Sequence, residues 1–290
     1  MMPTHTLIQA SEALTLAAQQ PLLWLDARFK LGQPQQGAAD FAGGHVAGAH
    51  YIDLERHLSG PAGAAGRHPL PMAATLAAQL AQWGLGHTMP VLIYDQGAVM
   101  YAARAWAMLR WLGHTAVAVV DGGLPALQQA GAHMASGQTR LPETGNFRAA
   151  TPLLRTVSAA DIAQQLIAQT LGQATAPFLV DARAAERFHG TPHPLDPRCG
   201  HIPGAVNRFF KLNLDAEQHF LPAAVLHPQW QGCLNGTPPP QVVHYCGSGV
   251  SACVNLLAME YAGLHGSALY VGSWSEWAAD ADNPVANGAA

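Results

Sequence analysis

An internal duplication is the feature that most limits how this chain of 290 residues can fold. Four segments of the first half recur in the second half, in the same order and with slowly drifting offsets. The pairs are 22–29 with 178–188, 44–54 with 200–210, 91–113 with 242–263, and 118–127 with 268–277. Because the period is long and the order is kept, we interpret the chain as two copies of one domain rather than as a solenoid of short repeats.

Each copy alternates short apolar segments with helix-like stretches. The segments 117–120 and 268–271 are typical of buried parallel strands, and 72–84 has the apolar pattern of a helix. We therefore expect an α/β fold with two tandem domains, each a parallel β-sheet flanked by helices. The expected parts are an N-terminal domain at 1–136, a polar linker punctuated by Gly and Pro at 137–152, and a C-terminal domain at 153–290.

Composition and charge exclude several classes of function. Hydrophobic residues make up 49 % of the chain, and the formal net charge of −4 provides no basic surface for nucleic acid. No apolar run reaches the length of a membrane-spanning helix, and the N-terminal residues contain no secretory signal. The four cysteines contain no CxxC pair, so they indicate neither a disulfide framework nor a zinc site. We expect a cytoplasmic protein that binds neither nucleic acid nor membrane and needs no metal or cofactor.

One cysteine stands where a parallel α/β sheet carries its reactive groups, at the carboxyl end of a strand. Cys246 follows the apolar run 242–245 and precedes a helix-like stretch, within the sequence Cys-Gly-Ser-Gly. A helix N-terminus carries partial positive charge, and Gly247 and Gly249 permit a turn whose amides point inward. Both features favour the thiolate, which is the reactive form of cysteine. A buried, inert cysteine is the alternative, but the turn suits chemistry better than packing.

The two copies differ at this position. The triplet Asp-Ala-Arg ends a strand in both copies, at 26–28 and 181–183, so we expect it to hold the fold. The cysteine, in contrast, corresponds to Asp95 in the first copy. Cysteine chemistry is therefore expected in the C-terminal domain alone. Cys253 falls inside the following helix, where we expect it to be a core residue.

The duplication and the motifs "DAR", "GHIPGA" and "GSWSEW" resemble the rhodanese-like sulfurtransferases over nearly the whole chain. Within that family, "CGSGVSA" is similar to the active-site loop of the 3-mercaptopyruvate sulfurtransferases, which reads Cys-Gly-Ser-Gly-Val-Thr-Ala. Ser251 replaces the threonine and keeps its hydroxyl. The resemblance implies two tandem rhodanese-like domains, with catalysis in the C-terminal copy and Asp95 marking an inactive N-terminal copy.

The resemblance also implies a reaction. Cys246 takes a sulfur atom from 3-mercaptopyruvate as a persulfide and passes it to an acceptor thiol, such as thioredoxin, or to cyanide. Thiosulfate is the alternative donor. The loop residues implied to bind the donor and the persulfide are Gly247, Gly249, Val250 and Ser251.

Two arginines match the family's ligands for the donor carboxylate. They are Arg187 in "AERFHG" and Arg198 in "DPRCGHIPG". Arginine suits this role because its planar guanidinium binds a carboxylate through two parallel hydrogen bonds. The alternative for each is an exposed surface cation.

A relay of serine, histidine and an acid has been proposed for proton handling in this family. The matching residues are Ser248 in the loop, His68 from the N-terminal half of the chain, and Glu55, with Asp53 as the alternative acid. Among 15 histidines a single one is more often structural, and that is the alternative for His68. Arg67, beside it, is expected to add positive charge to the site.

Three other functions compete with this interpretation. A cysteine phosphatase or arsenate reductase carries an arginine six positions after its cysteine, whereas this chain has Ala252 there. Thiosulfate-specific relatives carry basic side chains directly after the cysteine, where this chain has Gly247 and Ser248. A non-catalytic scaffold would lack the nucleophile, whereas Cys246 is present. We therefore expect 3-mercaptopyruvate to be the preferred donor.

Overall fold

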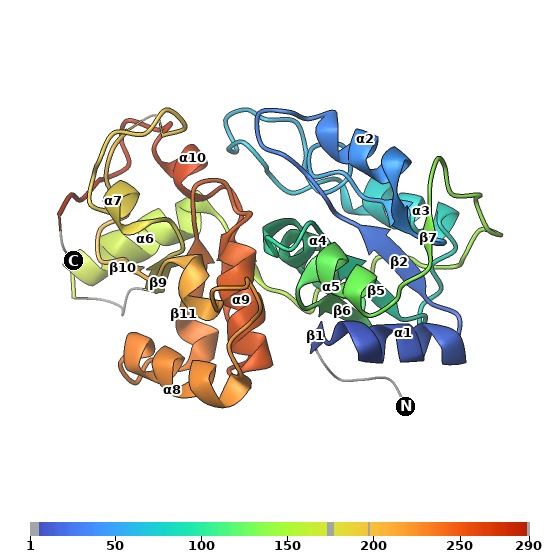
Figure 1. Cartoon of the computed structure of the whole chain (residues 1–290). Coiled ribbons are helices and arrows are strands. Elements are labelled where there is room, and N and C mark those ends of the chain that lie inside the picture. The colour runs from blue at the N-terminus through green and yellow to red at the C-terminus, as the bar shows by residue number, and fades with distance from the viewer. Residues whose placement is uncertain (1–5, 173–176, 197, 289–290) are drawn as a thin grey trace. The chain divides into compact units, whose positions relative to one another are not determined.

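The computed structural model of the chain describes residues 6–172, 177–196 and 198–288. It contains two compact units (Figure 1). The N-terminal unit comprises Met1–Gly60, Leu70–Leu153 and Asp215–Phe220, and the C-terminal unit comprises Pro61–Pro69, Leu154–Leu214 and Leu221–Ala290. Each unit therefore includes a short segment from the other half of the chain. The boundaries expected at 136 and 153 stay predictions.

Each unit contains one five-stranded sheet in which all neighbouring strands are parallel. The spatial order in the N-terminal unit is β1 (Leu7–Ile8), β6 (Val117–Val120), β5 (Val91–Tyr94), β2 (Leu23–Asp26) and β4 (His50–Tyr51). From the equivalent edge, the order in the C-terminal unit is β8 (Thr156–Val157), β12 (Ala268–Tyr270), β11 (Val242–Tyr245), β9 (Phe178–Asp181) and β10 (Val206–Asn207). The two orders are the same, which confirms the duplication and the predicted parallel α/β fold.

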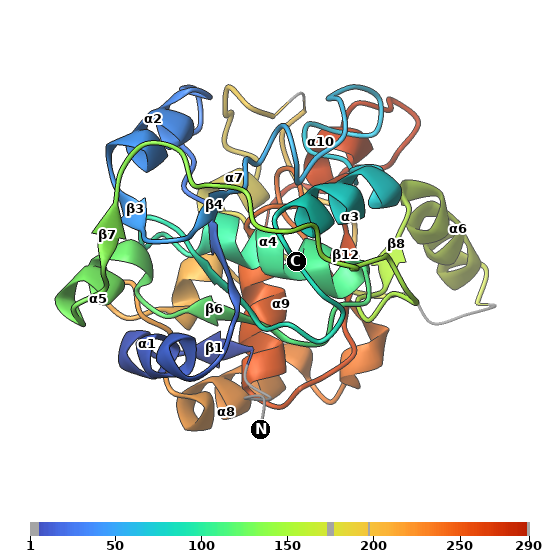
Figure 2. The same ribbon diagram turned by 90° about the vertical axis from the view of Figure 1, so that its right-hand side faces the viewer.

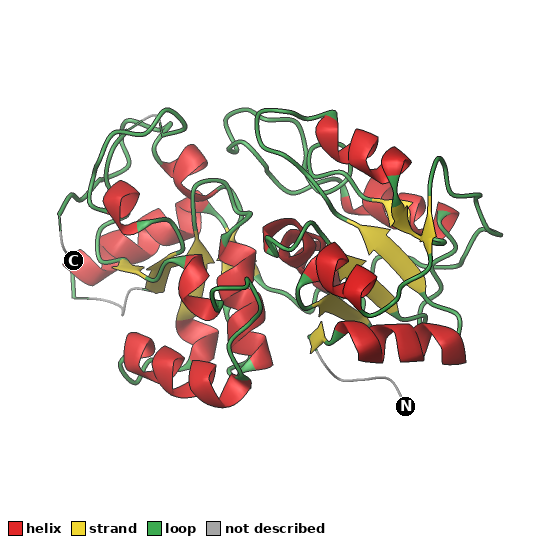
Figure 3. Ribbon diagram, in the orientation of Figure 1, coloured by secondary structure: helices red, strands yellow, loops and turns green. Residues whose placement is uncertain are grey.

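Helices cover both faces of each sheet (Figure 3). One face packs on α1 (Ala10–Gln19), α2 (Gln36–Gly43) and α5 (Gly123–Gln129) in the N-terminal unit, and on α6 (Ala159–Thr170), α7 (Ala185–Phe188) and α10 (Ser273–Trp277) in the C-terminal unit. Within the first set, α1 lies beside α5 (Figure 2). Alternate strand residues are buried on the other face, where α4 (Met100–Trp111) packs on β5 and β6, and α9 (Ala252–Tyr261) packs on β11 and β12. Because strand side chains alternate between faces, sheets covered on both sides need the continuous apolar runs seen in the sequence.

The remaining elements complete the two units. They are α3 (Ala73–Gln82), α8 (Ala223–Leu234), which packs on α9, the 3₁₀ helices η1 (Phe210–Asn213) and η2 (Pro239–Gln241), and the antiparallel pair β3 (His45–Val46) and β7 (Met134–Ala135). The equivalent of the β3–β7 pair in the C-terminal unit is a single antiparallel bridge between His201 and Ala286. The duplication therefore extends beyond the sheets to this edge pairing.

The repeated Asp-Ala-Arg triplet holds each sheet in the same way. Arg28 binds Asp26, and Arg183 binds Asp181, in each case through Nε and through Nη2 at 2.7 Å. Each guanidinium also donates to the carbonyl oxygen of the glycine before a repeated histidine. These pairs are buried in both units, so the expectation that the triplet is structural is confirmed.

The segment expected to be a linker, 137–152, contains no helix or strand but packs on the N-terminal unit. The Gly145 N–H donates to the Ala81 carbonyl oxygen over 2.8 Å, and the Phe147 N–H donates to that of Leu85 over 3.0 Å. The Phe147 ring is almost completely buried. These backbone hydrogen bonds and the buried Phe147 ring thus hold the irregular segment 137–152 against the N-terminal unit.

Candidate active site

Cys246 lies at the carboxyl end of β11, the central strand of the C-terminal sheet, and is 2 % exposed. The turn that follows β12 holds it there. The Cys246 N–H donates to the Ser273 hydroxyl over 3.1 Å, and its carbonyl oxygen accepts from the Trp274 N–H over 2.9 Å. The next carbonyl, that of Gly247, accepts from the Ser275 N–H over 3.0 Å. These bonds tie residues 246–251, the Cys246 loop, to the sheet edge.

Glycine is required at one position of the Cys246 loop. Gly249 has φ +75°, and a Cβ atom there would lie 2.2 Å from the carbonyl oxygen of Val271. A side chain at this position would meet both the strain of the left-handed region and a backbone atom that cannot move away alone. The Gly-Ser-Gly sequence therefore allows the loop to pass close against the end of β12.

The backbone amides of the Cys246 loop are available to an anion. In the part of the chain that the structure describes, no acceptor is found for the N–H groups of Gly247, Ser248, Val250 and Ser251. The α9 helix begins directly afterwards, at Ala252, so the partial positive charge of its N-terminus adds to these donors. The loop therefore has the donors to stabilise a sulfur anion on Cys246.

The equivalent loop of the N-terminal unit already surrounds the carboxyl group of an aspartate. The Asp95 carboxylate, at the cysteine's equivalent position, accepts hydrogen bonds at 2.8–3.3 Å from four backbone N–H groups. The donors are Gly97, Val99, Tyr101 and Ala102. The backbones of the two loops differ in detail, because φ is positive at Gly97 and Val99 in one and at Gly249 in the other. A loop between the central strand and the next helix can thus surround a hydrogen-bond acceptor with backbone N–H groups in this fold.

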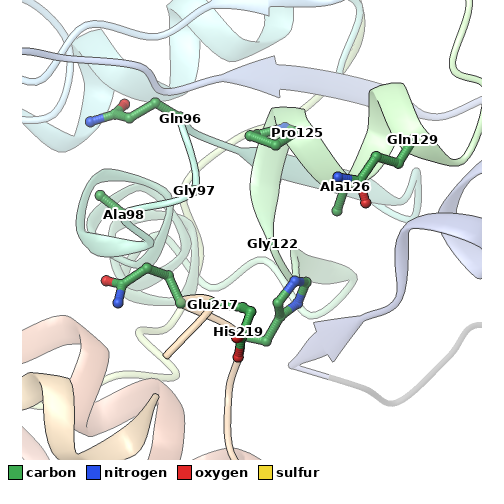
Figure 4. A pocket seen from close by; sticks show the side chains of 10 residues that line it. Gln96, Gly97, Ala98, Gly122, Pro125, Ala126, Gln129, Glu217 and His219 are labelled. Atoms are coloured by element: carbon green, nitrogen blue, oxygen red, sulfur yellow. The ribbon is translucent and has the colours of Figure 1, made fainter. Parts of the chain in front are cut away.

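A pocket of about 430 Å³ opens beside the Asp95 loop within the N-terminal unit (Figure 4). It is lined by Gln96, Gly97, Ala98, Gly122, Pro125, Ala126, Gln129, Glu217, Gln218 and His219. His219 approaches Gly122 so closely that a Cβ atom there would lie 2.3 Å from the imidazole. No thiol lines this pocket, and the neighbouring amides are already occupied by Asp95. The N-terminal unit therefore contains a pocket beside the position equivalent to Cys246, but this pocket has no thiol in its lining.

Two guanidinium groups lie beside Gly247, the residue that follows Cys246. A Cβ atom on Gly247 would lie 3.0 Å from Nη2 of Arg187, on α7, and 3.1 Å from Nη2 of Arg67. Arg67 also donates to the Gly247 carbonyl oxygen over 3.1 Å. Burial lowers the pKa of the Arg67 guanidinium, whereas the negative charges of Asp196 and of the Cys246 thiolate act in the opposite direction. The structure thus brings both arginines to the Cys246 loop.

Asp196 is part of this arrangement, although the sequence did not single it out. Its carboxylate accepts from Nε of Arg187 over 2.8 Å and from Nη2 over 2.6 Å. Nη1 of Arg183 lies 3.6 Å from Oδ2 of Asp196, and the Asp196 side chain is 3 % exposed. A buried carboxylate among guanidinium groups fixes both their positions and the local charge.

Ser248 and His68 form a pair in the C-terminal unit. The Ser248 hydroxyl lies 2.9 Å from Nδ1 of His68, which is buried in the segment 61–69. Glu55 belongs to the N-terminal unit, where its backbone N–H donates to Asp53. Asp53 itself accepts bonds from neighbouring residues at both oxygens. The serine–histidine contact expected from the sequence is therefore present, and the identity of the acid stays a prediction.

Arg198 has a different set of partners from the one expected. Its guanidinium donates to backbone carbonyl oxygens that follow α10, among them Ala278 at 3.0 Å, Asp280 at 2.7 Å and Asn283 at 3.0 Å. In the described residues it makes no hydrogen bond to the Cys246 loop. The Arg198 side chain therefore stabilises the backbone conformation of the segment 277–283.

Two residues that follow the Cys246 loop, Ala252 and Cys253, are buried in α9. Cys253 is fully buried, and its thiol donates to the Gly249 carbonyl oxygen over 3.3 Å, as expected for a core residue of α9. Ala252, where a phosphatase would carry its arginine, is buried at the first turn of α9.

The described ranges contain neither a metal-binding cluster nor a membrane-spanning helix. No group of three or more His, Cys, Asp or Glu side chains is arranged to hold a metal ion there. Nor does any described helix combine the length and apolar character needed to cross a membrane.

Comparison with known proteins gives a consistent result. A family model for the rhodanese-like domain matches the chain twice, at residues 9–130 and 160–280. A probable 3-mercaptopyruvate sulfurtransferase from Pseudomonas aeruginosa is 42 % identical over 290 residues, which cover 99 % of this chain and all of the relative. A putative thiosulfate sulfurtransferase from Mycobacterium tuberculosis is 39 % identical over 293 residues, covering 99 % of this chain and 98 % of the relative.

A solved structure shares the fold over most of the chain. The 3-mercaptopyruvate sulfurtransferase from Leishmania major superposes with a TM-score of 0.81 at 30 % identity, covering 95 % of this chain and 74 % of that one. Both relatives in sequence and this relative in structure are thus similar to the chain along nearly its whole length.

Proposed function

Because the chain belongs to the rhodanese-like sulfurtransferases, with two tandem domains, we propose that it transfers sulfur from 3-mercaptopyruvate through a persulfide on Cys246. The observation that carries this proposal is a thiol at the start of a loop whose amides are unoccupied and whose second residue, Gly247, lies beside the guanidinium groups of Arg67 and Arg187. A negative donor and a negative sulfur intermediate both match such a site.

In the first half of the reaction, the Cys246 thiolate attacks the sulfur atom of the donor. The carbon–sulfur bond breaks, and its electron pair goes to the carbon of the pyruvate enolate. That carbon then takes a proton and leaves as pyruvate. The Ser248 hydroxyl, hydrogen-bonded to His68, supplies this proton as a general acid. Arg187 and Arg67 hold the donor carboxylate throughout.

In the second half, an acceptor thiolate or cyanide attacks the outer sulfur of the persulfide. The sulfur–sulfur bond breaks, and Cys246 leaves as a thiolate that the loop amides stabilise. Thioredoxin is an acceptor of the expected chemical class. No cofactor takes part, because every electron pair that moves belongs to the donor, to Cys246 or to the acceptor.

Thiosulfate is the second candidate donor. It is favoured by the 39 % identity to a putative thiosulfate sulfurtransferase and by the two guanidinium groups beside Gly247. Against it, neither residue directly after Cys246 carries a positive side chain. We therefore rank thiosulfate below 3-mercaptopyruvate.

The test is steady-state turnover with each donor in turn, with cyanide as the acceptor. We expect kcat/KM to be at least about tenfold higher for 3-mercaptopyruvate, or about 1.4 kcal/mol in transition-state terms. Mass spectrometry after donor alone should show one added sulfur atom on Cys246. A preference for thiosulfate would overturn the donor, and full activity in Cys246→Ser would overturn the proposed reaction.

A further inference from the structure

Asp196 interacts with more than one arginine of the donor site. It binds Arg187 through two hydrogen bonds, lies 3.6 Å from Arg183, and raises the pKa of Arg67 against the effect of burial. Its side chain is 3 % exposed, so solvent screens these interactions weakly. A carboxylate in this position affects both the geometry and the charge of the site.

The geometric effect follows from the shape of the guanidinium group. Asp196 occupies the edge of Arg187 formed by Nε and Nη2. The other edge, formed by Nη1 and Nη2, lies toward Gly247, because a Cβ atom there would be 3.7 Å from Nη1 and 3.0 Å from Nη2. A planar carboxylate can bind that edge through two hydrogen bonds. Asp196 thus holds Arg187 with its unused edge turned to the donor.

The charge effect follows from the charged groups around the site. Positive charges come from Arg67, Arg183 and Arg187, and negative charges come from Asp181, Asp196 and the Cys246 thiolate. Because these six charges balance, removal of the Asp196 charge would leave one positive charge in excess. An excess positive charge favours thiosulfate, which carries two negative charges, over 3-mercaptopyruvate, which carries one.

Building on the proposed function, we propose that Asp196 is a positioning residue that also determines donor specificity. It orients Arg187 for a carboxylate, and its own charge disfavours a doubly charged donor. This role requires no contact between Asp196 and the donor.

The test uses two substitutions that separate charge from position. Asp196→Asn removes the charge at constant size, and we expect the ratio of kcat/KM for thiosulfate to that for 3-mercaptopyruvate to rise at least about tenfold. Asp196→Glu keeps the charge but moves the guanidinium, so KM should rise for both donors while the donor ratio stays close to that of the wild type. Glu186→Gln is the matched control, because it removes a negative charge from the exposed side of α7, the short helix that carries Arg187.

The outcomes distinguish this inference from the proposed function. A wild-type protein that turns over neither donor overturns both. An active wild type with an unchanged donor ratio in Asp196→Asn overturns the role of Asp196 alone, even where both rates fall together. If Asp196→Asn does not fold, Asp196→Glu decides, because a large change in donor ratio at constant charge contradicts the inference.

Discussion

Replacing Asp95 by asparagine tests whether loops of this fold stabilise a negative charge. Asp95→Asn keeps the size of the side chain but replaces one carboxylate oxygen by an NH₂ group. Two of the four N–H groups that now donate to the carboxylate would face another donor instead. The substitution therefore removes part of the anion binding without removing atoms from the core.

The magnitude follows from these contacts. A hydrogen bond to a charged group contributes about 1.5–3 kcal/mol, and two of them are lost. Burial disfavours the charged form and outweighs the four N–H groups, so the pKa of Asp95 is raised, and the net loss is smaller than the sum of two such bonds. We expect the free energy of unfolding to fall by about 2–4 kcal/mol, a large share of the stability of an ordinary domain.

The assay is equilibrium urea unfolding of the full chain, followed by tryptophan fluorescence. Asp40→Asn is the matched control, since it makes the same change at an exposed position of the same unit, where substitutions usually change stability by less than about 0.5 kcal/mol. If Asp95→Asn changes the free energy of unfolding as little as the control, the amides do not stabilise a charge there. The same argument for the Cys246 loop would then fail.

Two further substitutions test the site. Ser248→Ala should lower kcat with 3-mercaptopyruvate by about 100-fold, a typical loss for a general acid. The kcat with thiosulfate should change much less, because sulfite leaves without taking a proton. Equal losses with both donors in steady-state kinetics would contradict the relay. Arg198→Met should lower the free energy of unfolding by about 1–3 kcal/mol and expose 277–283 to proteolysis, while KM for either donor stays within about threefold. A tenfold rise in KM would restore Arg198 as a donor ligand.

The architecture was predictable because each prediction rested on local patterns that occur twice. The strands at 117–120 and 268–270 are continuous apolar runs, and such runs are needed where helices cover both faces of a sheet. Cys246 could be singled out for a related reason. A strand end, a glycine turn and a helix start are local signals, and in a parallel sheet they determine where a side chain lies.

The arginine partners were not predictable, because they depend on distant segments and on irregular loops. Arg67 is 180 positions from Gly247 in the chain. Arg187 and Asp196 are only nine residues apart, but the loop between them has no period that would indicate which residues face each other. Arg198, in the same stretch, matches a family position yet donates to carbonyl oxygens after α10. Motif matching identifies a residue, whereas its contacts depend on packing.

The segment 61–69 has a consequence for how this protein can evolve and be divided. A fragment that begins at residue 153 would contain Cys246 and Ser248 but would lack Arg67 and His68, which belong to the same compact unit. The two copies of the ancestral domain are therefore no longer modular. One copy carries Asp95 where the other carries Cys246, and its half of the chain supplies Arg67 and His68 to the unit that contains Cys246. Under the proposed function, this dependence would keep the two halves in one chain more than the connecting peptide does.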